Sequence, residues 1–174
     1  MEEWKQQVDV ILEIIIEIGS KKLEKKYKMY MMDKMLRIVS DIISSESLVT
    51  ASTYTNLRTC RRWSKGAVNL YNTIKEEIES TSGQPVNRSM VIKQKINGKH
   101  IFVVEHEYPL LIPKTGVLEK NWDTKTLREW MYNFSKITVI TKEEDLKLTK
   151  TSIDMETASK RYINAGIEIL DFCP

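Results

Sequence analysis

The chain has 174 residues, which is enough for one compact domain with a sizeable hydrophobic core. Hydrophobic residues make up 41%, charged residues make up 29%, and there are 6 Gly and 4 Pro, so the composition excludes collagen-like and low-complexity chains. The net charge of +3 permits contact with nucleic acid or with an acidic partner but argues for neither. Cys60 and Cys173 lie far apart, which suits a reducing compartment and excludes a disulfide scaffold and a cysteine-based zinc site.

The first third of the chain is predicted to be helical. Residues 2–27 form an amphipathic pattern with a break at Gly19 and Ser20. Their apolar run VDVILEIIIEI is too short to span a membrane and is interrupted by acids at every fourth position. No targeting signal is visible, and we expect no membrane association. Two more helices are predicted, over residues 30–44 and 57–78.

The clearest local signal is a hairpin over residues 89–109, with its turn at Asn97 and Gly98. Asn-Gly between alternating runs favours a type I′ turn, because both of its central positions need a positive φ. In the segment that follows, Pro109 and Pro113 argue against a regular helix or a central strand.

The last part of the chain is predicted as helix, strand and helix. The first helix covers residues 124–134, and the strand covers residues 136–141. The last helix is capped by Ser152 or Asp154 and has Glu156 in its first turn. The whole order predicts an α/β fold, a small mixed β-sheet surrounded by helices, in a single domain over residues 1–174.

A cluster of basic residues opens the third predicted helix. Their spacing of i, i+3, i+4 and i+7 would place four cations on one helix face: Arg58, Arg61, Arg62 and Lys65. Such a face can contact phosphate groups or an acidic partner surface, and a solvated helix face is the alternative. Without interleaved aromatic residues the pattern is a weak signal for nucleic acid.

Few residues could carry chemistry. His100 and His106, six positions apart on one predicted strand, would be separated by roughly 20 Å and could not share a metal ion. Glu105 and Glu107 share a strand face and could hold one cation together, although carboxylates at a strand end are more often solvated. No nucleotide-binding glycine motif is present.

The last forty residues resemble the end of the N-terminal endonuclease domain of the orthomyxovirus polymerase acidic subunit. In that family a strand leads into Thr-x-Glu-Glu, and a helix opening with an aliphatic residue, Asp, x and Glu follows. The corresponding residues here are Thr141, Glu143, Glu144, Ile153, Asp154, Glu156 and Thr157, with Lys160 and Arg161 continuing the basic pattern. The amphipathic start after MEEW and the order of elements also agree, and the divergence from influenza sequences suggests a thogotovirus-like genus.

The resemblance implies a PD-(D/E)xK endonuclease-like fold, in a family whose domain cuts capped host transcripts with two metal ions. Its chemistry needs a helix histidine, several carboxylates and a lysine, because these groups hold the cations and stabilise developing charge. Most of them have no counterpart here. The helix histidine would fall near Met35, and the Pro-Asp pair would fall within SMVIKQ, which contains neither residue. Glu105, reached by a slipped register, and Lys120, within LEKN, are the vestigial candidates.

The sequence therefore predicts the N-terminal domain of a viral RNA polymerase subunit with a degenerate active site, no nuclease activity in isolation, no bound metal and no cofactor. Its expected partners are the other polymerase subunits and viral or host RNA, in the host cell nucleus and in the virion. Two alternatives stay open. One is a weakly active metal-dependent cap-snatching endonuclease that uses Glu105, Glu107 and Lys120. The other is an unrelated RNA-binding module based on the basic helix face.

Overall fold

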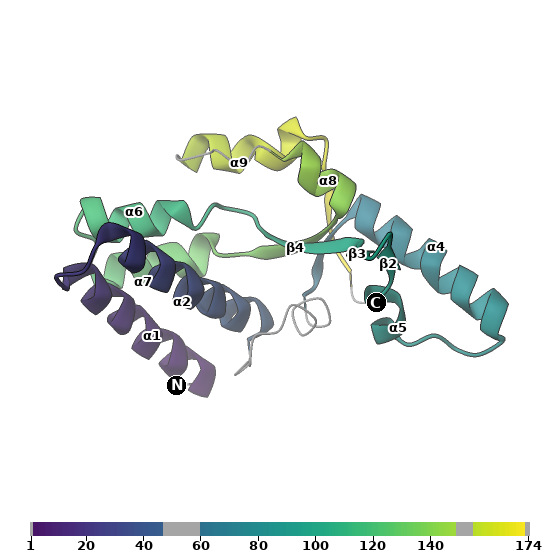
Figure 1. Ribbon diagram of the computed structural model, residues 1–174, viewed down its shortest axis with the longest axis horizontal. Helices are drawn as coiled ribbons and strands as arrows, with labels where there is room; N and C mark the ends of the chain where they lie inside the picture. Colours follow the sequence, from purple (N-terminus) through teal and green to yellow (C-terminus); the bar gives the residue numbers. More distant parts are fainter. Residues whose placement is uncertain (1, 47–59, 149–154, 173–174) are drawn as a thin grey trace. The chain divides into compact units, whose positions relative to one another are not determined.

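The computed structural model describes residues 2–46, 60–148 and 155–172. Over these residues the fold is mixed α/β, with eight helices and six strands (Figure 1). The predicted α/β class with a small mixed sheet is confirmed. The described residues fall into two compact units. In this part of the chain, no helix combines the length and the apolar character needed to cross a membrane.

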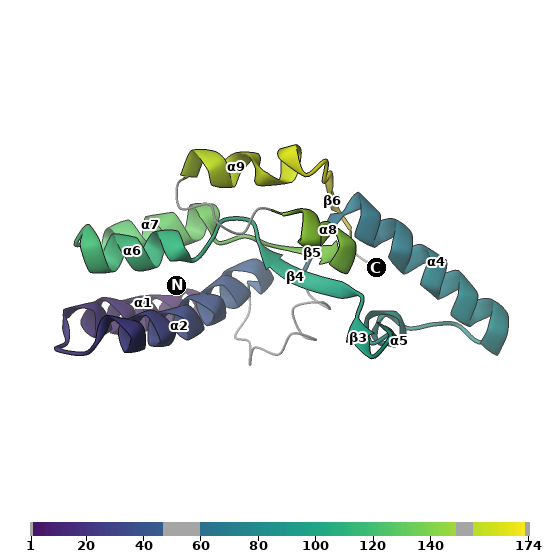
Figure 2. The same cartoon turned by 45° about the horizontal axis from the view of Figure 1, so that its top comes forward.

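The first unit is helical and contains α1 (Glu3–Ser20), α2 (Lys25–Ser45), α6 (Leu111–Glu119) and α7 (Thr124–Phe134). Figure 2 shows α1 and α2 side by side, joined by a short turn; a break was predicted at Gly19 and Ser20, and α1 ends at Ser20. The four helices share one core of buried side chains, among them Val8, Leu12, Leu36, Val117, Leu127, Trp130 and Met131. The predicted helix over residues 124–134 is confirmed, and Asp123 caps it by accepting a hydrogen bond from the Thr126 N–H at 2.7 Å.

The segment around Pro113 is helical, so the prediction of an irregular loop there was wrong. Pro113 is the third residue of α6 and lies in its first turn. The first four N–H groups of a helix have no partner within it, and therefore a proline in this turn removes no hydrogen bond. Farther along, a Cβ on Gly116 would lie 2.4 Å from the Trp122 ring, so this helix position requires glycine.

The second unit is built on a four-stranded sheet in the order β4 (Phe102–His106), β5 (Ile137–Thr141), β1 (Arg62–Ser64), β6 (Ile169–Asp171). Strand β1 runs parallel to β5 and antiparallel to β6, which makes the sheet mixed. The predicted strand over residues 136–141 is confirmed as β5. β6 lies where the last helix was predicted to continue, because α9 (Met155–Asn164) ends before Gly166, whose φ is +68°.

An aromatic cluster fills the space between the sheet and α4 (Lys65–Ser82). Trp63 on β1 is fully buried, and its ring packs edge-on against three rings, those of Tyr71, Phe102 and Phe172, at centroid distances of 5.4 to 5.7 Å. The Trp63 indole N–H donates to the Cys60 carbonyl at 2.9 Å, so the large buried ring leaves no polar atom without a partner.

The predicted hairpin turn is confirmed, but its first strand is shorter than predicted. β2 (Lys95–Ile96) pairs with β3 (Lys99–His100), and Asn97 and Gly98 both have positive φ, at 51° and 74°. The preceding residues form a short helix instead, α5 (Arg88–Ile92). Asn87 caps α5 by accepting a hydrogen bond from the Met90 N–H at 3.1 Å, and Val91 and Ile92 of this helix are fully buried.

Candidate functional site

Glu105, the vestigial carboxylate of the sequence prediction, lies on β4 and forms an ion pair with Arg161 of α9. The Arg161 side chain is 3% exposed and the Glu105 side chain 23% exposed, so the pair is largely shielded from water. Arg161 also lies 5.7 Å from the Tyr162 ring centroid. A buried guanidinium needs a counter-charge, and Glu105 supplies it. The arrangement gives this carboxylate a role inside the fold.

The other residues of the nuclease alternative are Lys120 and Glu107. Lys120 is exposed and forms the C-cap of α6 in the first unit, directly after the last helical residue, Glu119. The Glu107 N–H donates to the Lys136 carbonyl at 2.9 Å, also in the first unit. Glu107 follows Glu105 by two positions, directly after the end of β4.

The predicted basic helix face does not exist as such. Arg61 precedes β1, Arg62 is its first residue, and α4 begins only at Lys65. The cause is Ser64, whose side chain accepts a hydrogen bond from the Ala67 N–H at 2.9 Å and so fixes the helix start. Arg58 lies outside the described residues.

The cations of this segment differ in their surroundings. Arg61 is exposed and Arg62, on β1, is partly buried. The Lys65 ammonium lies 2.9 Å from the Glu168 carboxylate, which raises the pKa of Lys65 by hydrogen bonding and by charge. A contact of these residues with RNA or a partner stays a prediction.

The Thr-x-Glu-Glu segment forms the junction between β5 and α8 (Lys142–Lys147). Thr141 accepts a hydrogen bond from the Glu144 N–H at 3.1 Å, and the Glu144 carboxylate accepts from the Thr141 N–H at 2.9 Å. This reciprocal pair is a capping box, which satisfies two N–H groups at the helix start. The same carboxylate oxygen accepts from the Ser64 hydroxyl at 2.5 Å. Glu144 therefore joins α8 to the start of α4.

Gly66 makes this junction possible. A Cβ at Gly66 would lie 2.5 Å from one Glu144 carboxylate oxygen, closer than real Cβ atoms approach such groups. The absence of a side chain lets the carboxylate lie directly against α4. Neither Ser64 nor Gly66 could be linked to Glu144 from the sequence, because they are about eighty positions away from it.

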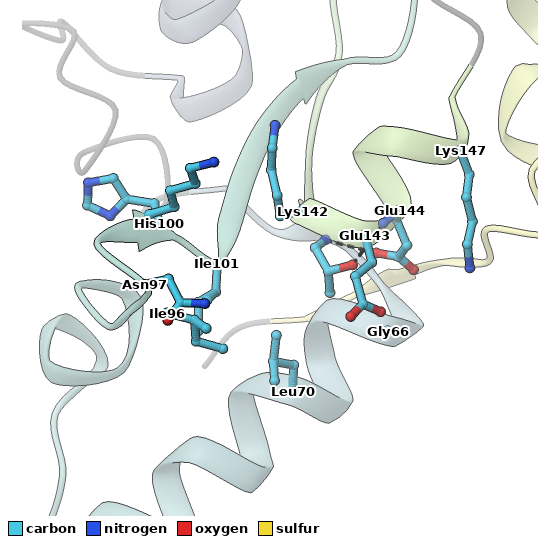
Figure 3. A pocket seen from close by; sticks show the side chains of 12 residues that line it. Gly66, Leu70, Ile96, Asn97, His100, Ile101, Lys142, Glu143, Glu144 and Lys147 are labelled. Atoms are coloured by element: carbon cyan, nitrogen blue, oxygen red, sulfur yellow. Dashed lines mark hydrogen bonds between the residues drawn. The ribbon is translucent and has the colours of Figure 1, made fainter.

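A pocket of about 560 Å³ opens beside this junction, between the hairpin, α4 and α8. Its apolar lining comes from Leu70, Ile96 and Ile101, and Glu143 faces the same space (Figure 3). In Figure 3 the His100 ring and the Lys142 ammonium point away from the centre of the pocket. Lys142 forms an ion pair with Asp145 at 2.5 Å. The volume suits a small ligand, but the titratable groups do not converge on one reacting atom.

The described residues contain no group of three or more His, Cys, Asp or Glu side chains arranged to hold a metal ion. No protein-family model, curated protein or solved structure matches this chain.

Proposed function

We propose that this chain is the N-terminal domain of the acidic subunit of an orthomyxovirus-type RNA polymerase, with an endonuclease-like fold and a degenerate active site. Its role is architectural. It docks against the other polymerase subunits and guides RNA during transcription, and it works in the host cell nucleus and in the virion. The domain itself does not cut RNA.

The ion pair between Glu105 and Arg161 is the observation that carries this proposal. Two-metal hydrolysis needs carboxylates that converge on the cations, and Glu105 is the one carboxylate that the resemblance offers. Its negative charge neutralises a buried guanidinium instead. Recruiting Glu105 to a metal ion would take its carboxylate away from the buried Arg161 guanidinium, a loss that disfavours metal binding there.

The local structure of the resembling segment adds support. The family pattern expects a strand that leads into Thr-x-Glu-Glu, and here β5 ends at Thr141, where α8 begins. Arg161, which continues the basic pattern of that segment, is the partner of Glu105. Both ends of the resembling segment thus take part in joining elements of the second unit.

Metal binding and RNA cleavage by the 174-residue chain test the proposal. A cation that binds only the folded state adds RT ln(1 + [L]/Kd), so millimolar Mn²⁺ on a micromolar site would add roughly 4 kcal/mol. For a chain of this size the melting temperature would then rise on the order of 10 °C. We expect a negligible shift with Mn²⁺ or Mg²⁺ and intact single-stranded RNA after long incubation.

The competing outcome is a shift of several degrees together with RNA cleavage. If Lys120→Ala, a surface change outside the ion pair, then abolished cleavage without lowering the melting temperature, the weakly active nuclease would be the correct interpretation. Glu143→Gln, which removes an exposed carboxylate near the pocket, serves as the matched control.

A further inference from the structure

The outer face of α2 is a stripe of exposed side chains, four of them apolar or aromatic and one a lysine, on the side opposite the core. It consists of Tyr27, Tyr30, Met31, Lys34 and Ile38. Tyr27 is 53% exposed and Tyr30 64% exposed. Tyr27, Met31, Lys34 and Ile38 follow a spacing of four, three and four residues, which keeps them on one line over three helical turns.

The same helix already buries a different face. Met32, Leu36 and Val39 are fully buried in the core of the first unit, about half a turn away from the stripe. A helix that only covers a core needs one apolar face. Single exposed apolar residues are normal on protein surfaces, but a continuous line of them marks an interaction site.

The charges around the stripe are basic. Residues 21–38 contain seven Lys or Arg and two Asp or Glu, a net charge of +5, whereas the whole chain carries +3. Within the stripe, the Lys34 ammonium lies 5.4 Å from the Tyr30 ring centroid, and the neighbouring Lys26 ammonium lies 4.8 Å from that of Tyr27. The apolar line is thus bordered by cations, and a complementary surface would be apolar with acidic borders.

Two other occupants fit less well. A second copy of this chain would place its lysines against those of the first, and like charges at an interface are unfavourable. RNA bases bind by stacking on flat side chains along their path, and Met31 and Ile38 offer no flat surface for stacking. The line with its spacing of four and three residues fits the side chains of another helix.

We propose that the outer face of α2 binds an acidic amphipathic helix of a partner protein. Met31 and Ile38 pack against the apolar residues of that helix, and the two tyrosines provide the large contact area typical of interface centres. Lys34 pairs with its flanking carboxylates, and Lys26, whose ammonium lies 2.9 Å from the exposed Glu24 carboxylate, exchanges this partner for one of them. This inference rests on the docking role proposed above and names the surface and the partner chemistry for it.

Fluorescence anisotropy with the full chain tests this surface. The probe is a labelled amphipathic peptide of about 20 residues, with leucines at alternating spacings of three and four and glutamates on both flanks. The control peptide carries lysine at every glutamate position. We expect the acidic peptide to bind with a Kd on the order of 10 µM and the basic peptide at least about tenfold more weakly.

Variants locate the binding. Met31→Glu and Lys34→Glu are each expected to weaken the acidic peptide by about tenfold or more, and Lys34→Glu should improve binding of the basic peptide. Leu146→Glu on α8 makes the same kind of change at a residue that is 75% exposed, and it should leave binding unchanged. Circular dichroism melting confirms that each variant folds.

Several results would overturn the inference: equal binding of both peptides, unchanged binding by Met31→Glu and Lys34→Glu, displacement of the peptide by oligouridine, or a dimer that Met31→Glu dissociates. Metal binding and RNA cleavage are measured on separate samples without peptide. A failure of this inference can therefore be told apart from a failure of the proposed function.

Discussion

At the scale of single residues, the pair of Glu105 and Arg161 makes the sharpest prediction about stability. Glu105→Gln leaves a guanidinium that is 3% exposed without its carboxylate, and we expect the free energy of unfolding to fall by about 3 kcal/mol. Replacing both partners, Glu105→Gln with Arg161→Met, should recover most of this loss, because two apolar or neutral groups of similar size tolerate burial.

Urea denaturation of the wild type, both single variants and the double variant measures the coupling between the two side chains. Glu143→Gln, at an exposed carboxylate, should change the unfolding free energy by less than about 0.5 kcal/mol. Strictly additive effects of the two single changes would show that the pair contributes no coupling, and the proposal would lose its main support.

Asp33 makes the second residue-scale prediction. Its burial raises the pKa of the carboxyl, but hydrogen bonds from Lys114 at 2.7 Å and Arg37 at 2.9 Å outweigh burial, so the pKa lies below its ordinary value. A lowered pKa stabilises the fold above the ordinary value of about 4, and this contribution disappears as the pH falls through the folded-state pKa.

We therefore expect Asp33→Asn to cost about 2 kcal/mol at pH 7, because it also leaves the largely buried Lys114 ammonium unpaired. The difference in unfolding free energy between Asp33→Asn and the wild type should shrink as the pH is lowered toward 3. Urea unfolding of both proteins at several pH values between 3 and 7 measures this difference as a function of pH. A difference that stays constant or grows with acidity would contradict the assignment.

At the scale of elements, the contact of Gly66 with Glu144 decides how α4 and α8 meet. A methyl group at position 66 would lie 2.5 Å from Oε1 of Glu144, and hydrogen bonds from Ser64 and Thr141 to the other oxygen, Oε2, hold this carboxylate in place. Gly66→Ala should therefore destabilise the chain by about 1–3 kcal/mol, although alanine is the better helix former. In a Glu144→Ala background the same change should be neutral or slightly stabilising, as thermal melting can show.

The elements that the sequence predicted correctly carry their signal within a few residues. Asn97 and Gly98 specify their own turn, and the run of β-branched residues at positions 137–141 favours a strand. The misplaced elements depend on distant partners. Arg62 lies in a strand because β1 pairs with β5 and β6. Both of these strands lie more than seventy positions farther along the chain. Helical spacing alone therefore placed four cations on a face that the sheet does not allow.

For the candidate site, too, the sequence identified residues that stand in a local pattern but not their distant partners. Glu105, Thr141 and Glu144 were identified as residues of interest because they stand in a recognisable pattern. Their partners, Arg161 and Ser64, lie 56 and 80 positions away from Glu105 and Glu144, so nothing local connects them. The outer face of α2 was missed for a different reason. Helical periodicity assigns apolar residues to a core, and it cannot separate two apolar faces of one helix when burial is unknown.

At the scale of the whole molecule, each compact unit is assembled from three separate stretches of the chain. The core of the first unit combines α1 and α2 with residues of α6 and α7, including Leu127, Trp130 and Met131. In the second unit, β1 needs β5 and β6 as its neighbours in the sheet. A fragment that ends at residue 105 would keep α1, α2 and β1 but lose all of these partners.

We expect the fragment of residues 1–105 to lack a cooperative unfolding transition. Losing Leu127 and Trp130 alone removes two core side chains that are each worth about 2–5 kcal/mol, and a domain of this kind is stable by only about 5–15 kcal/mol. The fragment should keep helical circular dichroism from α1 and α2, bind a hydrophobic dye and melt gradually. Mixing it with residues 106–174 should restore part of the sharp transition of the intact chain, because the missing core side chains return. A fragment that melts as sharply as the intact chain, without the second piece, would show that α1, α2 and β1 need none of these partners.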